Sequence, residues 1–206
     1  THTTMATYKL TYFNGRGRGE ISRYLFALAK KEFTDERVEQ ADWPKVKPTI
    51  PSGQVPALTI TVDGKDTIYG QSGAIERFLA REFGFYGSCN IDQLKIDQVA
   101  GIFGDLFAAF TKIKYGGVPE DKQGPLLKEF AEKTVPAKFA LLEKFFAVDN
   151  GPYLLGDKIS YADVILARFT DDFDTDAKVT KTLPNIQKAR EALDATFKDY
   201  REKRPK

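Results

Sequence analysis

The pattern of apolar side chains changes once along this 206-residue chain, close to Gly84, and that change limits the folds open to it. Before Gly84, segments that alternate polar and apolar residues, typical of half-buried strands, are mixed with segments of helical spacing. Turn residues separate them. The predicted order is strand, helix, strand, then strand, strand, helix, over residues 8–13, 19–31, 33–38, 57–62, 65–69 and a stretch capped by Ser72.

After Gly84 the strand pattern disappears. Residues 84–90 are aperiodic and contain glycine, as expected of a linker, and long helical periodicity follows over residues 91–115. Ser160 and Asp163 approximate a capping box, in which each side chain satisfies the other residue's backbone N–H. Further helices are predicted over residues 126–148, from Ser160 onward and between Pro184 and Leu193, with residues 200–206 as a basic, solvated end.

These elements predict an α/β plus all-α protein of two domains. The expected boundaries are 6–83 for the α/β domain, 84–90 for a linker and 91–206 for an all-helical domain. At about 150 residues per domain, the length fits one large domain or two small ones. A chain of this size buries roughly 70% of its unfolded surface, so a core needs no disulfide or metal.

Charge and scarce residues exclude several classes of function. Interspersed charges, 31 Lys and Arg against 29 Asp and Glu, give no basic surface for nucleic acid or anionic membrane, and no apolar run approaches a membrane span. His2 is the single histidine, which nearly excludes Ser-His-Asp and Cys-His catalysis and His-rich metal sites. The single cysteine, Cys89, fits a reducing, cytoplasmic compartment. The residues before Met5 lack a signal-peptide pattern and are expected to be a leader.

Four segments of the first domain carry candidate chemistry. Residues 14–19 (NGRGRG) resemble a phosphate-binding loop at a helix start, although a tight turn is the favoured interpretation. Residues 42–47 (DWPKVK) offer an indole donor and ammonium groups, or form a surface turn. A cis Val55–Pro56 bond would leave the backbone of Val55 free to pair with an extended peptide. Gln71-Ser72 is a carboxylate site or an ordinary helix cap.

The order of these segments resembles the sigma-class glutathione transferases, which include haematopoietic prostaglandin D synthase and the S-crystallins. The resemblance spans essentially the whole chain and is densest over residues 8–83. It is carried by residues 8–14 (YKLTYFN), 16–18 (RGR), 39–44 (EQADWP), 53–56 (GQVP), 71–72 (QS) and 160–163 (SYAD).

This resemblance implies a thioredoxin-like N-terminal domain, a helical C-terminal domain and a homodimer that binds glutathione as co-substrate. Tyr12 would donate a hydrogen bond to the glutathione sulfur and stabilise its thiolate, and Arg18 would add positive charge nearby. Tyr8 is the rival phenol, but it lies at the strand's start. The glutathione-binding residues implied are Tyr12, Phe13, Arg18, Trp43, Lys47, Gly53, Gln54, Val55, Gln71, Ser72 and, from the neighbouring subunit, Asp105.

The implied function is conjugation of glutathione to hydrophobic electrophiles, with hydroperoxide reduction as a further activity. The implied electrophile pocket is lined by Gly15, Gly17, Phe107, Ile165 and Phe169. Alternatives are a prostaglandin D isomerase and a non-catalytic S-crystallin-like structural protein or ligand carrier. The relatives' acidic cluster is thinned here to Asp97 and Asp105, so no metal is expected, and the synthases' second tryptophan is absent, which disfavours the isomerase. The long insertion of many S-crystallins is missing too.

Overall fold

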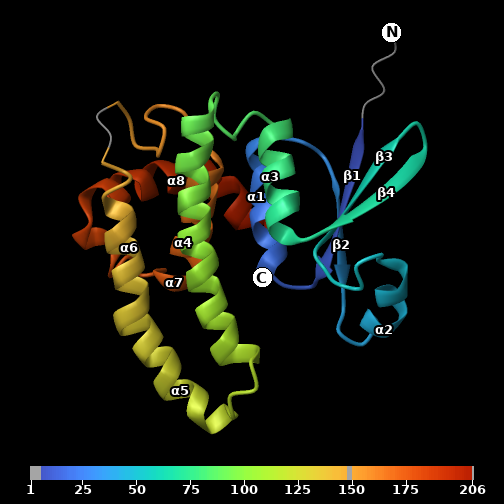
Figure 1. The fold of residues 1–206 in the computed structure, drawn as a ribbon, viewed down its shortest axis with the longest axis horizontal. Coiled ribbons are helices and arrows are strands. Elements are labelled where there is room, and N and C mark those ends of the chain that lie inside the picture. Colours follow the sequence, from blue (N-terminus) through green and yellow to red (C-terminus); the bar gives the residue numbers. More distant parts are fainter. Residues whose placement is uncertain (1–5, 148–149, 206) are drawn as a thin grey trace. The chain divides into compact units, whose positions relative to one another are not determined.

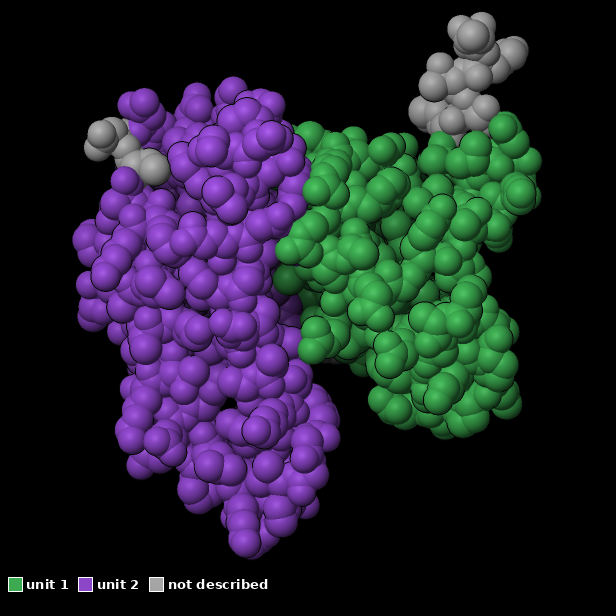
Figure 2. All heavy atoms as spheres, in the orientation of Figure 1, with its two compact units in different colours: residues 1–85, 196–206 green, residues 86–195 purple. Residues whose placement is uncertain are grey.

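The computed structural model describes residues 6–147 and 150–205, so the expectations for His2 and for a leader before Met5 lie outside the described residues. The chain divides into two compact units, coloured separately in Figure 2. Unit 1 contains the residues up to Phe85 together with those from Thr196 onward, and unit 2 contains residues 86–195. This division differs from the expected boundaries, because the end of the chain groups with the N-terminal residues.

Unit 1 is built on a mixed sheet of four strands in the order β2-β1-β3-β4. β1 pairs in parallel with β2, whereas β1–β3 and β3–β4 are antiparallel. Two helices, α1 and α3, pack beside each other against the sheet (Figure 1). The bounds are β1 Thr7–Phe13, α1 Glu20–Leu28, β2 Thr34–Val38, β3 Ala57–Val62, β4 Lys65–Gly70 and α3 Ser72–Glu82. The α/β expectation for this part of the chain is confirmed.

The core of unit 1 explains the strand pattern. Leu10 of β1 and Leu58 of β3 are register partners and are both buried. Side chains alternate between the two faces of a strand, so Leu10 and Leu58 meet the buried faces of the helices. Tyr24, Leu25 and Phe26 of α1 are fully buried. Burial of such side chains stabilises the fold by about 1.5–3 kcal/mol each.

A second connection of unit 1 carries a short helix, α2 (Trp43–Val46), followed by a 3-10 turn over Lys47–Thr49. Pro44 occupies the first turn of α2, where its missing N–H is no loss. The segment of residues 42–47 is therefore helical rather than a simple surface turn, and it holds Trp43 beside the end of β1.

Unit 2 is helical, as expected for the second half of the chain. The helices are α4 Asn90–Tyr115, α5 Glu120–Glu129, α6 Val135–Glu143, α7 Tyr161–Phe173 and α8 Pro184–Lys203, the last of which continues into unit 1. The prediction of a helix over residues 126–148 is confirmed for residues 126–143 and wrong at both ends. Helix begins at Glu120 with Pro125 inside it, a π-helical turn follows over Phe130–Thr134, and α6 ends at Glu143. Among the described residues, no helix combines the length and apolarity needed to cross a membrane.

The predicted capping box at the start of α7 is confirmed. The Asp163 carboxylate accepts hydrogen bonds from the Ser160 N–H (2.7 Å), the Ser160 hydroxyl (2.7 Å) and the Leu154 N–H (2.9 Å). Asp163 is completely buried, and this burial outweighs the hydrogen bonds and raises the pKa of its carboxyl group to about 6. The box ties the loop before α7 to its first turn.

The expectation of a solvated end over residues 200–206 is wrong for Tyr200 and Arg204. The Tyr200 hydroxyl donates to Glu20 Oε1 at 2.8 Å, and Arg204 Nη1 donates to the same oxygen at 3.2 Å. Tyr24 packs edge-on against Phe197 with ring centroids 4.7 Å apart. Phe197 and Tyr200 continue the helical spacing of apolar residues in α8. The end of this helix therefore packs into the core of unit 1.

Candidate functional site

The end of β1 and the glycine-rich loop after it enclose Tyr12. The backbone N–H of Arg18 donates a hydrogen bond of 2.9 Å to the Tyr12 phenol oxygen. A Cβ atom on Gly17 would collide with that oxygen, and one on Gly19 would lie 2.8 Å from the ring. Gly17 also has a φ of +38°, a conformation that favours glycine. The segment of residues 14–19 is thus a tight turn wrapped over the Tyr12 ring.

The rival phenol, Tyr8, is held differently. Its hydroxyl donates to Glu82 Oε1 at 3.2 Å, and the side chain is almost completely buried. Burial, reinforced by the Glu82 charge, raises the pKa of Tyr8 to about 12. Tyr8 is therefore a structural phenol, committed to a carboxylate of the same unit.

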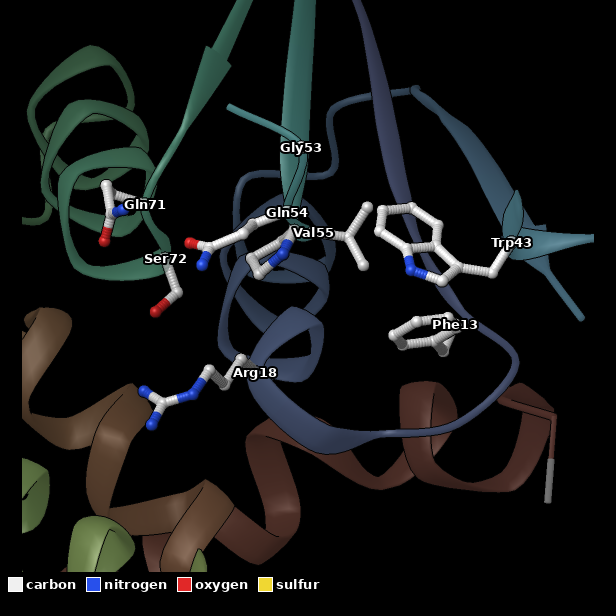
Figure 3. Close-up of a pocket in the computed structure, with 9 residues that line it drawn as sticks. Phe13, Arg18, Trp43, Gly53, Gln54, Val55, Gln71 and Ser72 are labelled. Atoms are coloured by element: carbon white, nitrogen blue, oxygen red, sulfur yellow. The ribbon is translucent and has the colours of Figure 1, made fainter. Parts of the chain in front are cut away.

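A cavity of about 580 Å³ opens beside the Tyr12 loop, entirely within unit 1. It is large enough for a peptide-sized ligand. Figure 3 shows Trp43 and Phe13 on one side of the site and Gln71 and Ser72 on the other. Its lining consists of Phe13, Arg18, Trp43, Gly53, Gln54, Val55, Pro56, Gln71 and Ser72.

Most of the residues expected to bind glutathione are brought together here. Eight of them line the cavity, whereas Tyr12, Lys47 and Asp105 do not. Tyr12 precedes the lining residue Phe13, and their rings are 5.8 Å apart. Lys47 runs past Gly53, where its Cε lies 3.6 Å from the position a Cβ would take. Asp105 is on α4 in unit 2, exposed, and 3.3 Å from the Lys138 ammonium.

The apolar side of the cavity is formed by two aromatic rings from different elements. Phe13 ends β1 and Trp43 begins α2, and their rings meet edge to face with centroids 5.3 Å apart. Such a pair contributes about 0.5–1.5 kcal/mol beyond its buried area. The contact fixes the indole ring beside the cavity and leaves its N–H as a potential donor.

The polar side of the cavity is the N-terminus of α3. Ser72 is the first helical residue and not the cap, which corrects the prediction: Gln71 occupies the cap position. Gln71 has a φ of 71°, unusual for a residue other than glycine. The first intrahelical hydrogen bond starts at the N–H of Ala74, which donates to the Gln71 carbonyl, so the N–H groups of Ser72 and Gly73 precede the helix ladder. This end of α3 suits a carboxylate.

The floor of the cavity is the segment before β3. The Val55–Pro56 peptide bond is cis, the conformation considered from the sequence. Pairing of β3 with β1 begins at Ala57, so Val55 lies outside the ladder, and it lines the cavity. Gly53 has a φ of 60° and its N–H donates to the Ile50 carbonyl at 2.8 Å. A peptide backbone could add to this edge, as in strand addition.

The residues expected around an electrophile belong to two different units. Gly15 and Gly17 belong to the Tyr12 loop of unit 1. Ile165 and Phe169 are buried on α7 in unit 2. The ring of Phe107 on α4 meets Phe169 edge to face, with centroids 6.2 Å apart. Phe107 and Phe169 belong to an aromatic cluster of unit 2 that also contains Phe103, Phe110, Phe130, Phe139 and Phe173.

Sequence reasoning missed Pro56 at the cavity and two buried charged residues of α1, Glu20 and Arg23, which lie outside the cavity lining. Pro56 lines the cavity although only its effect on Val55 was considered. Glu20 and Arg23 of α1 are 1% and 2% exposed, yet their charges were assigned no role. Their spacing of three residues on a helix, the spacing of a side-chain pair, was the available signal. Within residues 6–147 and 150–205, no group of three or more His, Cys, Asp or Glu side chains could hold a metal ion.

Comparison with known proteins identifies a consistent set of relatives. Residues 104–204 match the family model described as "Glutathione S-transferase, C-terminal domain". The chain is 40% identical over 166 residues to "Glutathione S-transferase 3" of Caenorhabditis elegans, covering 79% of this chain and 78% of that protein. It is 39% identical to the "Hematopoietic prostaglandin D synthase" of Gallus gallus, covering 77% of this chain and 75% of that protein. The solved structure "Fasciola hepatica sigma class GST" superposes with a TM-score of 0.85 at 30% identity, covering 98% of both chains.

Proposed function

The chain belongs to the glutathione S-transferase family, and from that premise we propose that it conjugates reduced glutathione to hydrophobic electrophiles through a thiolate held by Tyr12. One observation carries the proposal: the Tyr12 oxygen accepts the Arg18 N–H at 2.9 Å beside a peptide-sized cavity. Because that oxygen already has a donor, the phenol's own proton is available for a second hydrogen bond outward.

The chemistry asks for a stabilised sulfur anion. A free thiol has a pKa of about 8.5, so only a few per cent is thiolate at neutral pH, although the thiolate is the nucleophile. A Tyr12 hydroxyl that donates to sulfur favours the anion, and the Arg18 guanidinium, which lines the same cavity, adds positive charge. The thiol proton leaves to solvent. The sulfur then forms a bond to the electrophilic carbon, and a leaving group such as chloride departs with the electrons of its own bond.

The cavity supplies a clamp for the rest of the tripeptide. We assign the Val55 backbone to the cysteinyl segment, and Trp43 and Lys47 to the glycine carboxylate. The α3 N-terminus, with Gln71 and Ser72, would hold the γ-glutamyl carboxylate, since its leading N–H groups precede the helix ladder. The further members of this proposed set, each lining the cavity, are Phe13, Gly53 and Gln54.

We further propose a sigma-class homodimer in which Asp105 of one subunit reaches the γ-glutamyl amine in the other. The side chain of Asp105 is 73% exposed, as a residue that serves a second copy would be. Several large apolar side chains are exposed as well, among them Tyr69 and Phe78 in unit 1 and Ile91 and Leu94 in unit 2. A homodimer interface that covers them would remove this apolar surface from water.

The electrophile is proposed to be apolar, with Gly15, Gly17, Phe107, Ile165 and Phe169 around it. The aromatic cluster of unit 2 supports this, since Phe107 and Phe110 are only half-buried. Lipid hydroperoxides are further proposed substrates. The thiolate would attack the terminal oxygen, the O–O bond would break and the lipid alcohol would leave. A second glutathione would then convert the sulfenic acid into oxidised glutathione and water. We propose a detoxifying role in the cytoplasm, supported by a lone, exposed Cys89.

A prostaglandin D isomerase is the second candidate, favoured by the 39% identity to the Gallus gallus synthase. Glutathione would then act as a cofactor and would not be consumed. Incubation with prostaglandin endoperoxide and glutathione separates the two functions. Prostaglandin D formed without net loss of thiol supports the isomerase, whereas conjugate formation supports the transferase.

The test of the proposed function is glutathione conjugation to chlorodinitrobenzene by the parent, Tyr12→Phe and Tyr8→Phe. Removal of the Tyr12 hydroxyl is expected to lower kcat by about 100-fold, the usual loss for one donor to a reacting anion. Tyr8→Phe is the matched control. It removes a phenol hydroxyl from the same strand, but this hydroxyl donates to Glu82. Full activity in Tyr12→Phe would contradict the assignment.

A further inference from the structure

The loop that covers Tyr12 is held closed by one buried side chain of α1. Arg23 is 2% exposed, and its guanidinium contacts three separate segments of unit 1. Nη1 donates to the Gly15 carbonyl at 2.8 Å and to Glu20 Oε2 at 3.1 Å. Nε donates to Asp35 Oδ1 on β2 at 2.9 Å. One nitrogen therefore ties the first residue of the loop, Gly15, to the first residue of α1, Glu20.

The same guanidinium also lies beside the Tyr12 ring, with its Cζ atom 5.9 Å from the ring centroid. A cation within about 6 Å of an aromatic face is attracted to it. The second terminal nitrogen, Nη2, is buried and has no hydrogen-bond acceptor in the described structure. The Tyr12 ring therefore offers a favourable cation–π contact to a buried guanidinium whose Nη2 atom lacks a hydrogen-bond acceptor.

The far side of this network is fixed as well. Glu20 is 1% exposed, and while Oε2 accepts from Arg23, Oε1 accepts from Tyr200 and Arg204 of the last helix. Asp35 holds Arg23 through one oxygen and Arg37 through the other, at 2.9 Å and 2.8 Å. Both carboxylates that orient Arg23 are therefore themselves oriented, which leaves the guanidinium a single position.

We propose that Arg23 is a positioning residue for the Tyr12 phenol: it clamps the two ends of the loop over residues 15–20, so that the Arg18 N–H stays on the phenol oxygen and directs the hydroxyl proton outward. This rests on the proposed function of Tyr12. Arg23 does not line the cavity, so it acts on the reaction through Tyr12 and not through the bound tripeptide.

The variants that test this are Arg23→Gln and Arg23→Lys, with Arg190→Gln as the matched control. Arg190 is also a largely buried arginine, but it belongs to unit 2 and pairs with the buried Asp174 carboxylate at 3.2 Å. If Arg23→Gln does not fold, Asp35→Asn replaces it, because the amide weakens the Nε contact while Glu20 still pairs with Arg23. The control is then Asp174→Asn, which weakens the corresponding ion pair of Arg190.

Conjugation of glutathione to chlorodinitrobenzene is measured across pH, together with the ultraviolet absorbance of the bound thiolate. Arg23→Gln is expected to lower kcat by about 10- to 100-fold at neutral pH, as a small misplacement of a reacting group does. The KM for glutathione should stay within about threefold, because the cavity residues assigned to the tripeptide are all still present. The bound thiol should titrate at higher pH, with Arg23→Lys in between. Parental kcat and thiol titration in Arg23→Gln, or an equal loss of kcat at every pH, would overturn the proposal.

A readout that does not depend on turnover separates this proposal from the proposed function. Fluorine NMR of protein labelled with fluorotyrosine gives a Tyr12 resonance, assigned by its loss in Tyr12→Phe. This resonance should shift or broaden in Arg23→Gln and stay unchanged in Arg190→Gln. A parent without conjugating activity contradicts the proposed function alone. An unchanged Tyr12 resonance in Arg23→Gln contradicts the positioning role, whether or not the parent turns over.

Discussion

The peptide N–H of Arg18 donates a hydrogen bond of 2.9 Å to the phenol oxygen of Tyr12. The glycine-rich segment of residues 16–19 (RGRG) is therefore packed over an aromatic ring. This hydrogen bond couples the conformation of the loop to the position of the phenol. Loop residues that would be interchangeable on an open surface are constrained here by the ring beneath them.

Gly17→Ala should impair both activity and stability. The added Cβ would collide with the Tyr12 oxygen, and the φ of +38° is unfavourable for alanine. We expect a loss of about 1–3 kcal/mol in the free energy of unfolding, measured with urea, and at least about a tenfold lower kcat. Gly101→Ala on α4 is the control, because no atom lies within 4 Å of its Cβ position. A variant with parental activity would show that the loop does not hold the phenol.

Ser72→Ala should weaken glutathione binding without slowing the chemical step. Hydrogen bonds to charged groups contribute about 1.5–3 kcal/mol, which corresponds to a KM for glutathione raised by roughly 10- to 100-fold. Because the carboxylate contact is the same before and during reaction, kcat should not change. Steady-state kinetics with varied glutathione measures both. Ser88→Ala serves as the control, since that hydroxyl binds Asp92 outside the cavity. A fall in kcat at constant KM would refute the assignment.

The stability of the chain should carry a signature of Asp163 between about pH 4 and pH 6. Burial raises the pKa of this carboxyl group from 3.8 to about 6. Its folded form therefore holds the proton more tightly than its unfolded form, and the resulting stabilisation is present below the unfolded pKa and lost as pH rises through 6.

The comparison with Asp163→Asn isolates this contribution. Relative to that variant, the free energy of unfolding of the parent should fall by up to about 3 kcal/mol as the pH increases through this window, at 1.36 kcal/mol per pKa unit. Urea unfolding at several pH values measures the difference. Asp157→Asn, an exposed carboxyl group in the preceding loop, is the control. A difference that does not vary with pH would mean that the buried carboxyl group is charged throughout.

Tyr200→Phe should destabilise unit 1 from the far end of the sequence. Its hydroxyl is a donor to the buried Glu20 carboxylate, and removing a partner of a buried polar group costs about 1–3 kcal/mol. Burial, with the Glu20 charge, also raises the pKa of Tyr200 above its ordinary value of 10.0. This contribution should therefore be fully present below that pH and be lost progressively as the pH rises above it towards the higher pKa of the folded state. Urea unfolding and hydrogen exchange in α1 measure the loss. Tyr115→Phe, 78% exposed, should have no effect.

The sequence predicts the sheet and the start of α7 well because their signals are local. Alternation over residues 57–62, the hairpin turn at Asp63-Gly64 and the capping box at Ser160 each act through neighbours in the chain. The order of the motifs also led to a set of residues expected to bind glutathione, and eight of them line one cavity.

The failures share a different cause, which is contact between distant segments. The solvated end was wrong because the partners of Tyr200 and Arg204 lie on α1, about as far away as the sequence allows. Arg23 was missed for the same reason, since its role is visible only once Gly15, Asp35 and Tyr12 surround it.

The end of α8 has a consequence for how the protein is made. Residues from Thr196 onward complete unit 1, yet a ribosome synthesises them only after all of unit 2. During translation the Glu20 carboxylate and the Tyr24 ring therefore lack these contacts until residues 197–204 have been synthesised. The nascent first unit therefore matures last, and the loop over Tyr12 acquires its full support only when the second unit has already left the exit tunnel.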